Sequence, residues 1–210
     1  MADLGKIAES LIAGKIDEVE SMVKDAVDSG TDPQEAVEKG LLAGMDVVGQ
    51  RFKSGEMFIP EVLRSAKAMH AGMEILRPLL SESDSKSAGT MVIGTVEGDL
   101  HDIGKNLVGM MFEGAGYKVV NLGIDLKPQV FVDAVKEHNP DILAMSALLT
   151  TTMPKMGETI NALKEAGVRD KVKIMVGGAP VTAEFAEEIG ADAYAANAAS
   201  SVDKARAIGA

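Results

Sequence analysis

Three residues of one short turn, Asp99, His101 and Gly104, have the types and spacing of a metal-binding site. They lie in the segment EGDLHDIGKN, residues 97–106, which follows the apolar run MVIGTV. An imidazole can bind a metal through one ring nitrogen while a nearby carboxylate accepts a hydrogen bond from the other and fixes the tautomer. A glycine at the start of the next helix lets a bulky ligand approach the backbone. Taken alone, the pattern fits a helix cap or a solvent-exposed turn equally well.

The same turn does not have the pattern of a phosphate-binding loop. Five residues separate Gly98 from Gly104 where a P-loop has four, and Asn106 stands where the P-loop has its magnesium-binding hydroxyl. The dinucleotide fingerprint GxGxxG is also absent from this turn. A pyrophosphate is therefore not the predicted ligand.

Two further segments are expected at the same rim. Ser146–Met153, SALLTTTM, carries four hydroxyl side chains after an apolar run, and residues 177–180, GGAP, follow another. Loops at the carboxyl ends of parallel strands converge on one edge of the sheet. Each segment alone could be an ordinary polar loop or a tight turn. Together with the histidine turn, they suit a large, mostly neutral ligand that bears a metal.

The pattern of apolar residues, which predicts the elements that position this site, changes near residue 88. Before it, apolar residues such as Val62, Ala66, Met69 and Met73 recur at helical spacing, which predicts a four-helix bundle. Residues 81–89, SESDSKSAG, have the small and polar composition of a linker. We therefore expect two domains, which are residues 1–88 and 89–210.

After the linker, short apolar runs alternate with helical stretches. The predicted strands are Met91–Val96, Lys118–Leu122, Ile142–Ser146, Ile174–Val176 and Ala193–Ala195. The predicted helices are 103–115, 128–138, 154–166, 182–189 and 200–207. This alternation predicts an α/β fold, a flavodoxin-like, doubly wound, five-stranded parallel sheet with helices on both faces.

Composition excludes several classes of protein. The formal net charge is −11, and both halves are acidic, so neither is a nucleic-acid platform. The chain has no cysteine, which excludes disulfides and thiolate-bound metals. It has no apolar run long enough for a membrane span and no basic leader, so we expect a cytoplasmic protein that does not bind membranes.

The three rim segments, in this order, resemble the signature of cobalamin-binding domains, which reads DxHxxG, then SxL, then GG. From about residue 30 to 200 the chain is similar to the small corrinoid proteins of anaerobic methyltransferase systems. The arrangement also resembles the cobalamin-binding module of methionine synthase. Residues 44–69, GMDVVGQRFKSGEMFIPEVLRSAKAM, look like the helical bundle that caps the exposed corrin face in that family.

This resemblance implies a role for each matching residue. His101 would be the lower axial ligand of cobalt, Asp99 its hydrogen-bond partner, and Thr152 the end of the relay, where the methionine synthase module has serine. In the cap, Phe52 and Ile59 would lie over the upper face of cobalt with Glu38 nearby. Asp102 matches the family pattern, and its predicted role is a helix cap or a cofactor contact. The other implied cofactor-binding residues are Gly98, Leu100, Ile103, Gly104, Ser146, Leu148, Thr150, Gly177, Gly178 and Ala198.

The function implied is that of a methyl carrier in anaerobic one-carbon metabolism, a non-catalytic subunit of a methyltransferase system. Its cofactor would be cobalamin in the methylcobalamin form. Cobalt(I) would accept a methyl group through a substrate-specific methyltransferase, from methanol, a methylamine, a quaternary amine or an aryl methyl ether. A second methyltransferase would deliver the group to tetrahydrofolate or coenzyme M, and a reductive activator would be a third partner.

Three alternatives stay open at this point. A cobalamin-dependent sensor also joins a helical bundle to such a domain, but would carry a basic DNA-binding region that these residues lack. The small subunit of an adenosylcobalamin mutase shares DxHxxG but lacks the bundle. A flavodoxin-like signalling domain would bind no corrinoid.

Overall fold

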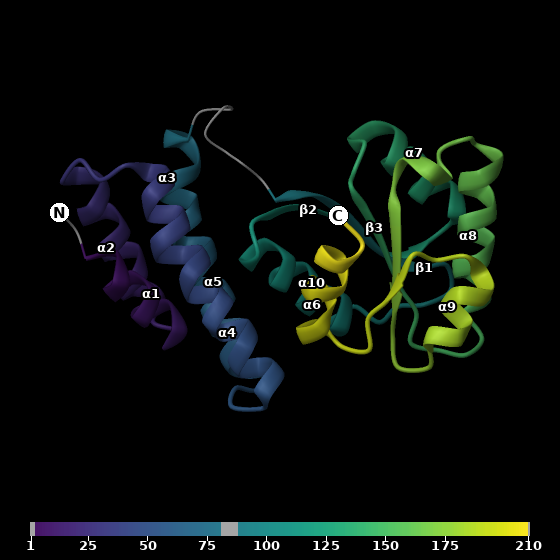
Figure 1. Ribbon diagram of the computed structural model, residues 1–210, viewed down its shortest axis with the longest axis horizontal. Coiled ribbons are helices and arrows are strands. Elements are labelled where there is room, and N and C mark those ends of the chain that lie inside the picture. Colours follow the sequence, from purple (N-terminus) through teal and green to yellow (C-terminus); the bar gives the residue numbers. More distant parts are fainter. Residues whose placement is uncertain (1–2, 81–87, 210) are drawn as a thin grey trace. The chain divides into compact units, whose positions relative to one another are not determined.

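The computed structural model describes residues 3–80 and 88–209, which form a helical unit before residue 81 and an α/β unit from residue 88 (Figure 1). We describe each unit by itself. Most of the predicted linker 81–89 lies outside the described residues. Its last residue, Gly89, begins the first strand of the sheet.

The helical unit contains four helical segments, as predicted. They are α1 (Leu4–Ile12), α2 (Ile16–Asp28), the continuous run of α3 (Pro33–Ala36), η1 (Val37–Leu42) and α4 (Ala43–Ser54), and α5 (Ile59–Leu76) with its short extension η2 (Arg77–Leu79). Apolar residues at helical spacing, such as Leu11, Val23, Leu41 and Val48, are fully buried between these helices. The segment η1 is a π-helix, an irregularity that the sequence pattern did not reveal.

The α/β unit alternates strands and helices along the chain. Its elements are β1 (Gly89–Val96), α6 (Ile103–Gly114), β2 (Tyr117–Leu126), α7 (Pro128–His138), β3 (Ile142–Ser146), α8 (Pro154–Glu165), η3 (Arg169–Lys171), β4 (Lys173–Gly177), α9 (Ala183–Ile189), β5 (Ala193–Tyr194) and α10 (Ala198–Ala207). All strand pairs are parallel, and their order is β2-β1-β3-β4-β5. This is the flavodoxin-like order, so the predicted fold class is confirmed.

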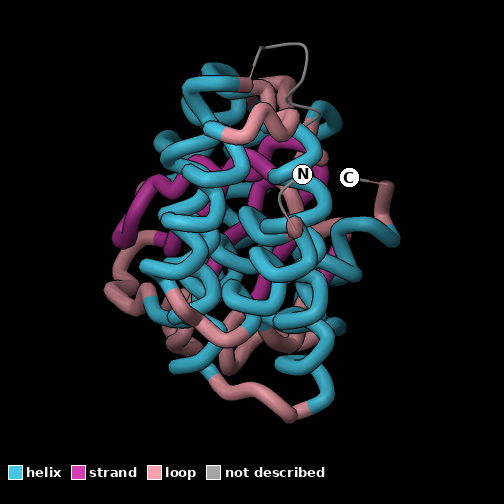
Figure 2. The backbone as a smooth tube through the Cα atoms, turned by 90° about the vertical axis from the view of Figure 1, so that its left-hand side faces the viewer, coloured by secondary structure: helices cyan, strands magenta, loops and turns pink. Residues whose placement is uncertain are grey.

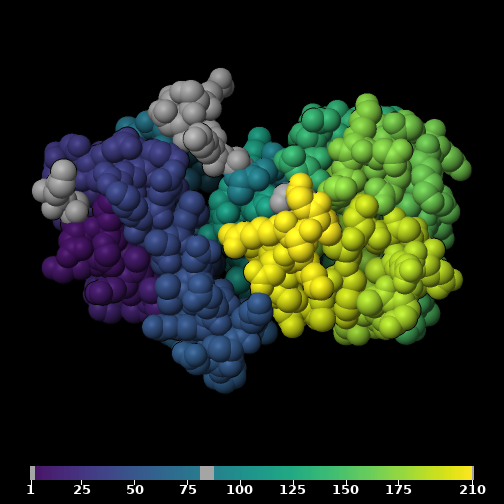
Figure 3. All heavy atoms as spheres, in the orientation of Figure 1, coloured from purple at the N-terminus to yellow at the C-terminus, as the bar shows by residue number. Residues whose placement is uncertain are grey.

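Helices cover both faces of the sheet. In Figure 1, α7, α8 and α9 lie on one side of the strands, and α6 and α10 lie on the other. The five strands are hydrogen-bonded side by side in one sheet, and the strand segments that are visible in Figure 2 are magenta. The helix α10 lies at the surface of the unit (Figure 3). This two-sided cover explains why the strands read as nearly continuous apolar runs.

The two faces of the sheet serve different purposes because successive residues of a strand point to opposite sides. The main apolar core is formed by every second residue of the strands, such as Val92, Leu143 and Ile174. These side chains pack with Phe131 of α7 and Ile160 of α8. The side chains of the intervening strand residues point to the other face of the sheet, toward α6 and α10. The site described below lies on this second face.

One strand is longer than predicted. We expected β2 to end at Leu122, but it continues to Leu126 through two shifts of register against β1. Gly123 and Asp125, which normally indicate a turn, have positive φ angles of 96° and 55° in this extension. The irregular pairing accommodates them within the strand.

Within residues 3–80 and 88–209, none of the helices is long and apolar enough to cross a membrane.

Gly178 should be the most sensitive glycine of the sheet rim. A Cβ atom there would lie 1.8 Å from the carbonyl oxygen of Ala147, and its φ of +134° disfavours any side chain. We expect Gly178→Ala to lower the free energy of unfolding by about 2–4 kcal/mol, from backbone strain and overpacking together. Urea unfolding measures the change. Gly167→Ala is the matched control, because Gly167 also has a positive φ, +67°, but its Cβ would meet nothing within 4 Å. Equal losses in the two variants would contradict the steric explanation.

Candidate functional site

A cavity of about 570 Å³ opens at the carboxyl ends of β1, β3 and β4. The strand order reverses between β1 and β3, and ligands of doubly wound sheets bind at this switch point. The loop after β1 carries His101, and the loop after β3 carries Leu148 and Thr152. Gly178, directly after β4, also lines the cavity. The topology therefore brings all three predicted rim segments to the same point.

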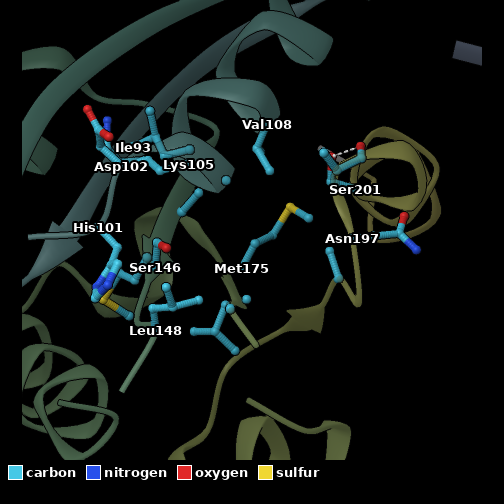
Figure 4. Close-up of a pocket in the computed structure, with 18 of the residues that line it drawn as sticks. Ile93, His101, Asp102, Lys105, Val108, Ser146, Leu148, Met175, Asn197 and Ser201 are labelled. Carbon is cyan, nitrogen blue, oxygen red and sulfur yellow. Dashed lines mark hydrogen bonds between the residues drawn. The ribbon is translucent and has the colours of Figure 1, made fainter. Parts of the chain in front are cut away.

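The cavity extends between the second face of the sheet and the helices α6 and α10. Ile93, Ala144 and Met175 line its floor from three neighbouring strands, while Val108 of α6 and Ser201 of α10 line its sides. In Figure 4, His101, Ser146 and Leu148 lie at one end of the cavity and Val108, Asn197 and Ser201 at the other, with Met175 between them. This shape and its mostly apolar wall suit a large organic ligand.

Asp99 is fully buried, and its carboxylate accepts four hydrogen bonds. Oδ1 accepts from the backbone N–H of His101 at 3.1 Å and pairs with its Nδ1 at 2.7 Å. Oδ2 accepts from the backbone N–H of Leu148 at 2.7 Å and from the Thr152 hydroxyl at 2.8 Å. One side chain thus joins the loop after β1 to the loop after β3.

The hydrogen bonds determine the charge of this carboxylate. Burial by itself would raise the pKa of Asp99, but the donors from Leu148, from the ring and backbone of His101, and from Thr152 together hold it well below its usual range. Asp99 is therefore ionised near neutral pH, when it can only accept hydrogen bonds.

The ionised Asp99 dictates how the ring of His101 is presented. Because the carboxylate is an acceptor only, Nδ1 carries the proton, and Nε2 of the neutral ring keeps a free lone pair. The Thr95 hydroxyl also donates to the backbone carbonyl of His101 at 2.9 Å. The side chain of His101 is 51% exposed, so Nε2 is available to a ligand in the manner of a metal-bound histidine.

The structure brings most of the predicted binding residues together. Gly98, Asp99 and Thr152 support the histidine turn without lining the cavity. The predicted residues that line it are Leu100, His101, Asp102, Ile103, Gly104, Ser146, Leu148, Gly177, Gly178 and Ala198. A Cβ at Gly104 would meet nothing within 4 Å, so this side of the turn leaves room for a ligand.

The remaining four predicted residues do not line the cavity. Thr150 is exposed and does not line the cavity. In the helical unit, Glu38 accepts a hydrogen bond from Gln34, Phe52 is half-buried and Ile59 is 42% exposed. Their assignment to a ligand stays a prediction.

Asp102 now has a structural role, which sequence reasoning left open. Its carbonyl oxygen accepts from the backbone N–H of Asn106 at 2.7 Å, and its Oδ2 accepts from the Asn106 side-chain amide at 3.1 Å. It therefore stabilises the first turn of α6. Asp102 also lines the cavity.

Sequence reasoning missed Lys105, Val108, Met175, Asn197 and Ser201, which also line the cavity. The alternation of side chains along a strand could have indicated Met175, because it lies on the same face as Gly177. The spacing of three residues on a helix could likewise have indicated Ser201, because it lies on the same face as Ala198. No pattern in the sequence indicated that Lys105 is buried. Its side chain is only 3% exposed, its Nζ donates to the amide oxygens of Asn106 and Asn121, and burial lowers its pKa.

Comparison with known proteins agrees with this geometry. Residues 89–203 match a family model described as a B12 binding domain, and residues 4–77 match a second model with the same description. The chain is 50% identical over 189 residues to trimethylamine corrinoid protein 1 of Methanosarcina acetivorans, covering 89% of this chain and 88% of the relative. It is 46% identical to a corrinoid protein of Desulfitobacterium hafniense, covering 99% and 98%.

A solved structure resembles the chain over most of its length. It is the methanol:cobalamin methyltransferase complex of Methanosarcina barkeri, with a TM-score of 0.88 and 35% sequence identity. The match covers 96% of this chain and 77% of the chain in that complex.

Asp99→Asn should weaken the fold most strongly near neutral pH. The amide has a single acceptor oxygen, so one pair of donors would face its NH₂ group. We expect a loss of about 1–3 kcal/mol in the free energy of unfolding at pH 7. Because the folded pKa of Asp99 is lowered, its ionised form stabilises the wild type above about pH 4, and this contribution fades as the pH falls further. The deficit of the variant should therefore shrink in acid.

Urea unfolding of the apoprotein between pH 2 and pH 8 measures this deficit. Asp141→Asn is a suitable control, because Asp141 accepts the backbone N–H of Thr90 and one acceptor oxygen satisfies that bond. A deficit for Asp99→Asn that stays constant across this pH range would contradict the assignment of an ionised Asp99.

Proposed function

The chain belongs to the family of B12-binding proteins, the corrinoid proteins of methyltransferase systems, and on this premise we propose that it carries a methyl group between two methyltransferases. Its cofactor is cobalamin. The observation that carries the proposal is the ring of His101, held by the buried carboxylate of Asp99 at the mouth of a mostly apolar cavity.

The residues of the site fit a corrinoid. Nε2 of His101 is a free imidazole donor for cobalt, Gly104 leaves its side of the turn open, and the cavity beyond is bounded by small or apolar residues such as Ala144 and Gly177. The corrinoid supplies the cobalt centre that accepts and releases the methyl group. The protein supplies the axial donor, the binding cavity and the surface for the partner enzymes.

Each residue of the relay has a distinct task in this scheme. Asp99 holds the proton of His101 at Nδ1, which keeps the Nε2 lone pair directed away from the relay. The hydroxyl of Thr152 has one proton and lies near two acceptors, Asp99 at 2.8 Å and the carbonyl of Leu149 at 3.0 Å. The shorter, charge-assisted bond to Asp99 is the stronger of the two. Thr152 thereby helps to keep Asp99 ionised.

For the methyl donor we propose a methylated amine. The support is the 50% identity of the chain to trimethylamine corrinoid protein 1, over 89% of this chain. One partner would then be an amine-specific methyltransferase. A second methyltransferase would use tetrahydrofolate or coenzyme M, and a reductive activator would restore the cofactor. We propose that this exchange takes place in the cytoplasm.

The donor assignment can be tested with separate partner enzymes. The cobalamin-loaded and reduced protein is mixed with an amine-specific or a methanol-specific methyltransferase and its substrate, and methylation of the cofactor is followed by absorption. We expect methylation with the amine pair. Methylation with the methanol pair alone would contradict the donor assignment but retain the carrier function.

His101→Ala should abolish ligation of cobalt by the protein's imidazole. We expect the absorption and electron paramagnetic resonance spectra of the loaded variant to lose the features of an imidazole ligand, and cobalamin affinity to fall by at least about tenfold. His138→Ala is the control, because His138 ends α7 and does not line the cavity. Spectra of His101→Ala that match those of the wild type would refute His101 as the axial ligand.

A further inference from the structure

We infer that Asp125, in the irregular end of β2, is a positioning residue for His101. It acts through the main chain of Gly98 and Asp99 and does not line the cavity. The inference rests on the proposed role of His101 as the ligand of cobalt. It adds a contribution from β2 to a site that is otherwise built from the loops after β1, β3 and β4.

Asp125 holds the histidine turn with two hydrogen bonds. Its Oδ1 accepts from the backbone N–H of Gly98 at 2.7 Å. Its own backbone N–H donates to the carbonyl oxygen of Asp99 at 3.1 Å. One residue of β2 therefore binds two consecutive residues of the turn, one through its side chain and one through its backbone.

The backbone of Asp125 has an unusual conformation that this pairing explains. Among the described residues other than glycine, only Asp125 and Asn139 have positive φ angles, 55° and 42°. Asn139 ends α7 in a left-handed cap, a common place for such a residue. Asp125 ends no helix. It lies between the paired positions Gly123 and Leu126, where the register of β2 against β1 shifts.

A turn residue alone would not need a carboxylate at this position. Glycine adopts a positive φ with less strain than aspartate, so the backbone by itself favours glycine. Both Gly98 and Asp125 are exposed, so water could satisfy the Gly98 N–H if the carboxylate were absent. The specific consequence of the carboxylate is that Gly98 is held in one orientation.

The orientation of Gly98 affects the position of the His101 ring through Asp99. Gly98 precedes Asp99, whose Oδ1 must stay 2.7 Å from Nδ1 of His101 while its Oδ2 stays bound to Leu148 and Thr152. The loop after β3 holds the carboxylate, and β2 holds the backbone of the same residue. Without the carboxylate of Asp125, β2 keeps only its backbone bond to Asp99. Gly98 is then free to rotate, which misaligns the ring of His101.

Three variants separate positioning from simple stability. Asp125→Gly removes the carboxylate and relieves the positive φ. Asp125→Asn keeps an acceptor oxygen and tolerates the same φ, so it is the conservative rescue. Asn139→Gly is the matched control, because it relieves a positive φ of similar size at the end of α7. Urea unfolding of each apoprotein reports stability, and absorption and electron paramagnetic resonance of the cobalamin-loaded protein report the fraction with imidazole bound to cobalt.

We expect Asp125→Gly to unfold at the same urea concentration as the wild type or a higher one. The ratio of imidazole-bound to unbound cobalt should nevertheless fall about fivefold, the effect of one lost hydrogen bond. Asp125→Asn and Asn139→Gly should keep the wild-type ratio. An unchanged ratio in Asp125→Gly would overturn the inference, as would a ratio that falls only together with the unfolding midpoint.

His101→Ala serves as the reference for the unbound state. If the wild type and His101→Ala gave the same spectrum, the proposed function itself would fail. If they differ while Asp125→Gly matches the wild type, only the role of Asp125 fails.

Discussion

The burial of one charged carboxylate is the constraint on which the site depends. A buried charge is tolerated only when hydrogen bonds replace the water that it has lost. Asp99 meets this requirement with donors from its own turn and from the loop after β3. The two loops must therefore lie together at the switch point of the sheet, and the position of His101 follows, because its ring is one of the donors.

The pleat of the sheet explains why a binding cavity and a complete core coexist in a small domain. The side chains on one face of the sheet pack against α7 and α8 and form the core. On the opposite face, small residues such as Ala144 and Gly177 leave space below α6 and α10. The cavity is therefore not a defect in the core. It is a separate region, and its residues can be selected for a ligand without disturbing the buried cluster.

The division of labour between protein and cofactor follows from this arrangement. The chain offers an oriented imidazole, a mostly apolar wall and a rim of exposed leucine and isoleucine side chains, and it leaves the reactive chemistry to the corrinoid. Among the described residues, the left-handed backbone of Asp125 lies where the ligand turn is held, and this conformation is strained for a residue other than glycine. Strain at such points persists because the surrounding contacts determine the conformation.

The sequence by itself determined the order of the elements, the parallel sheet, and the pairing of Asp99 with His101, because periodicity and short motifs express local physical preferences. The resemblance to the cobalamin-binding module of methionine synthase also indicated Thr152. Only the tertiary structure revealed the buried Lys105, the left-handed Asp125 and the extension of β2, since Gly123 and Asp125 read locally as a turn. These features depend on contacts between strands that are distant in the chain, and no local pattern records such contacts. The second wall of the cavity, formed by α6 and α10, was decided in the same way, by the face of the sheet on which each helix packs.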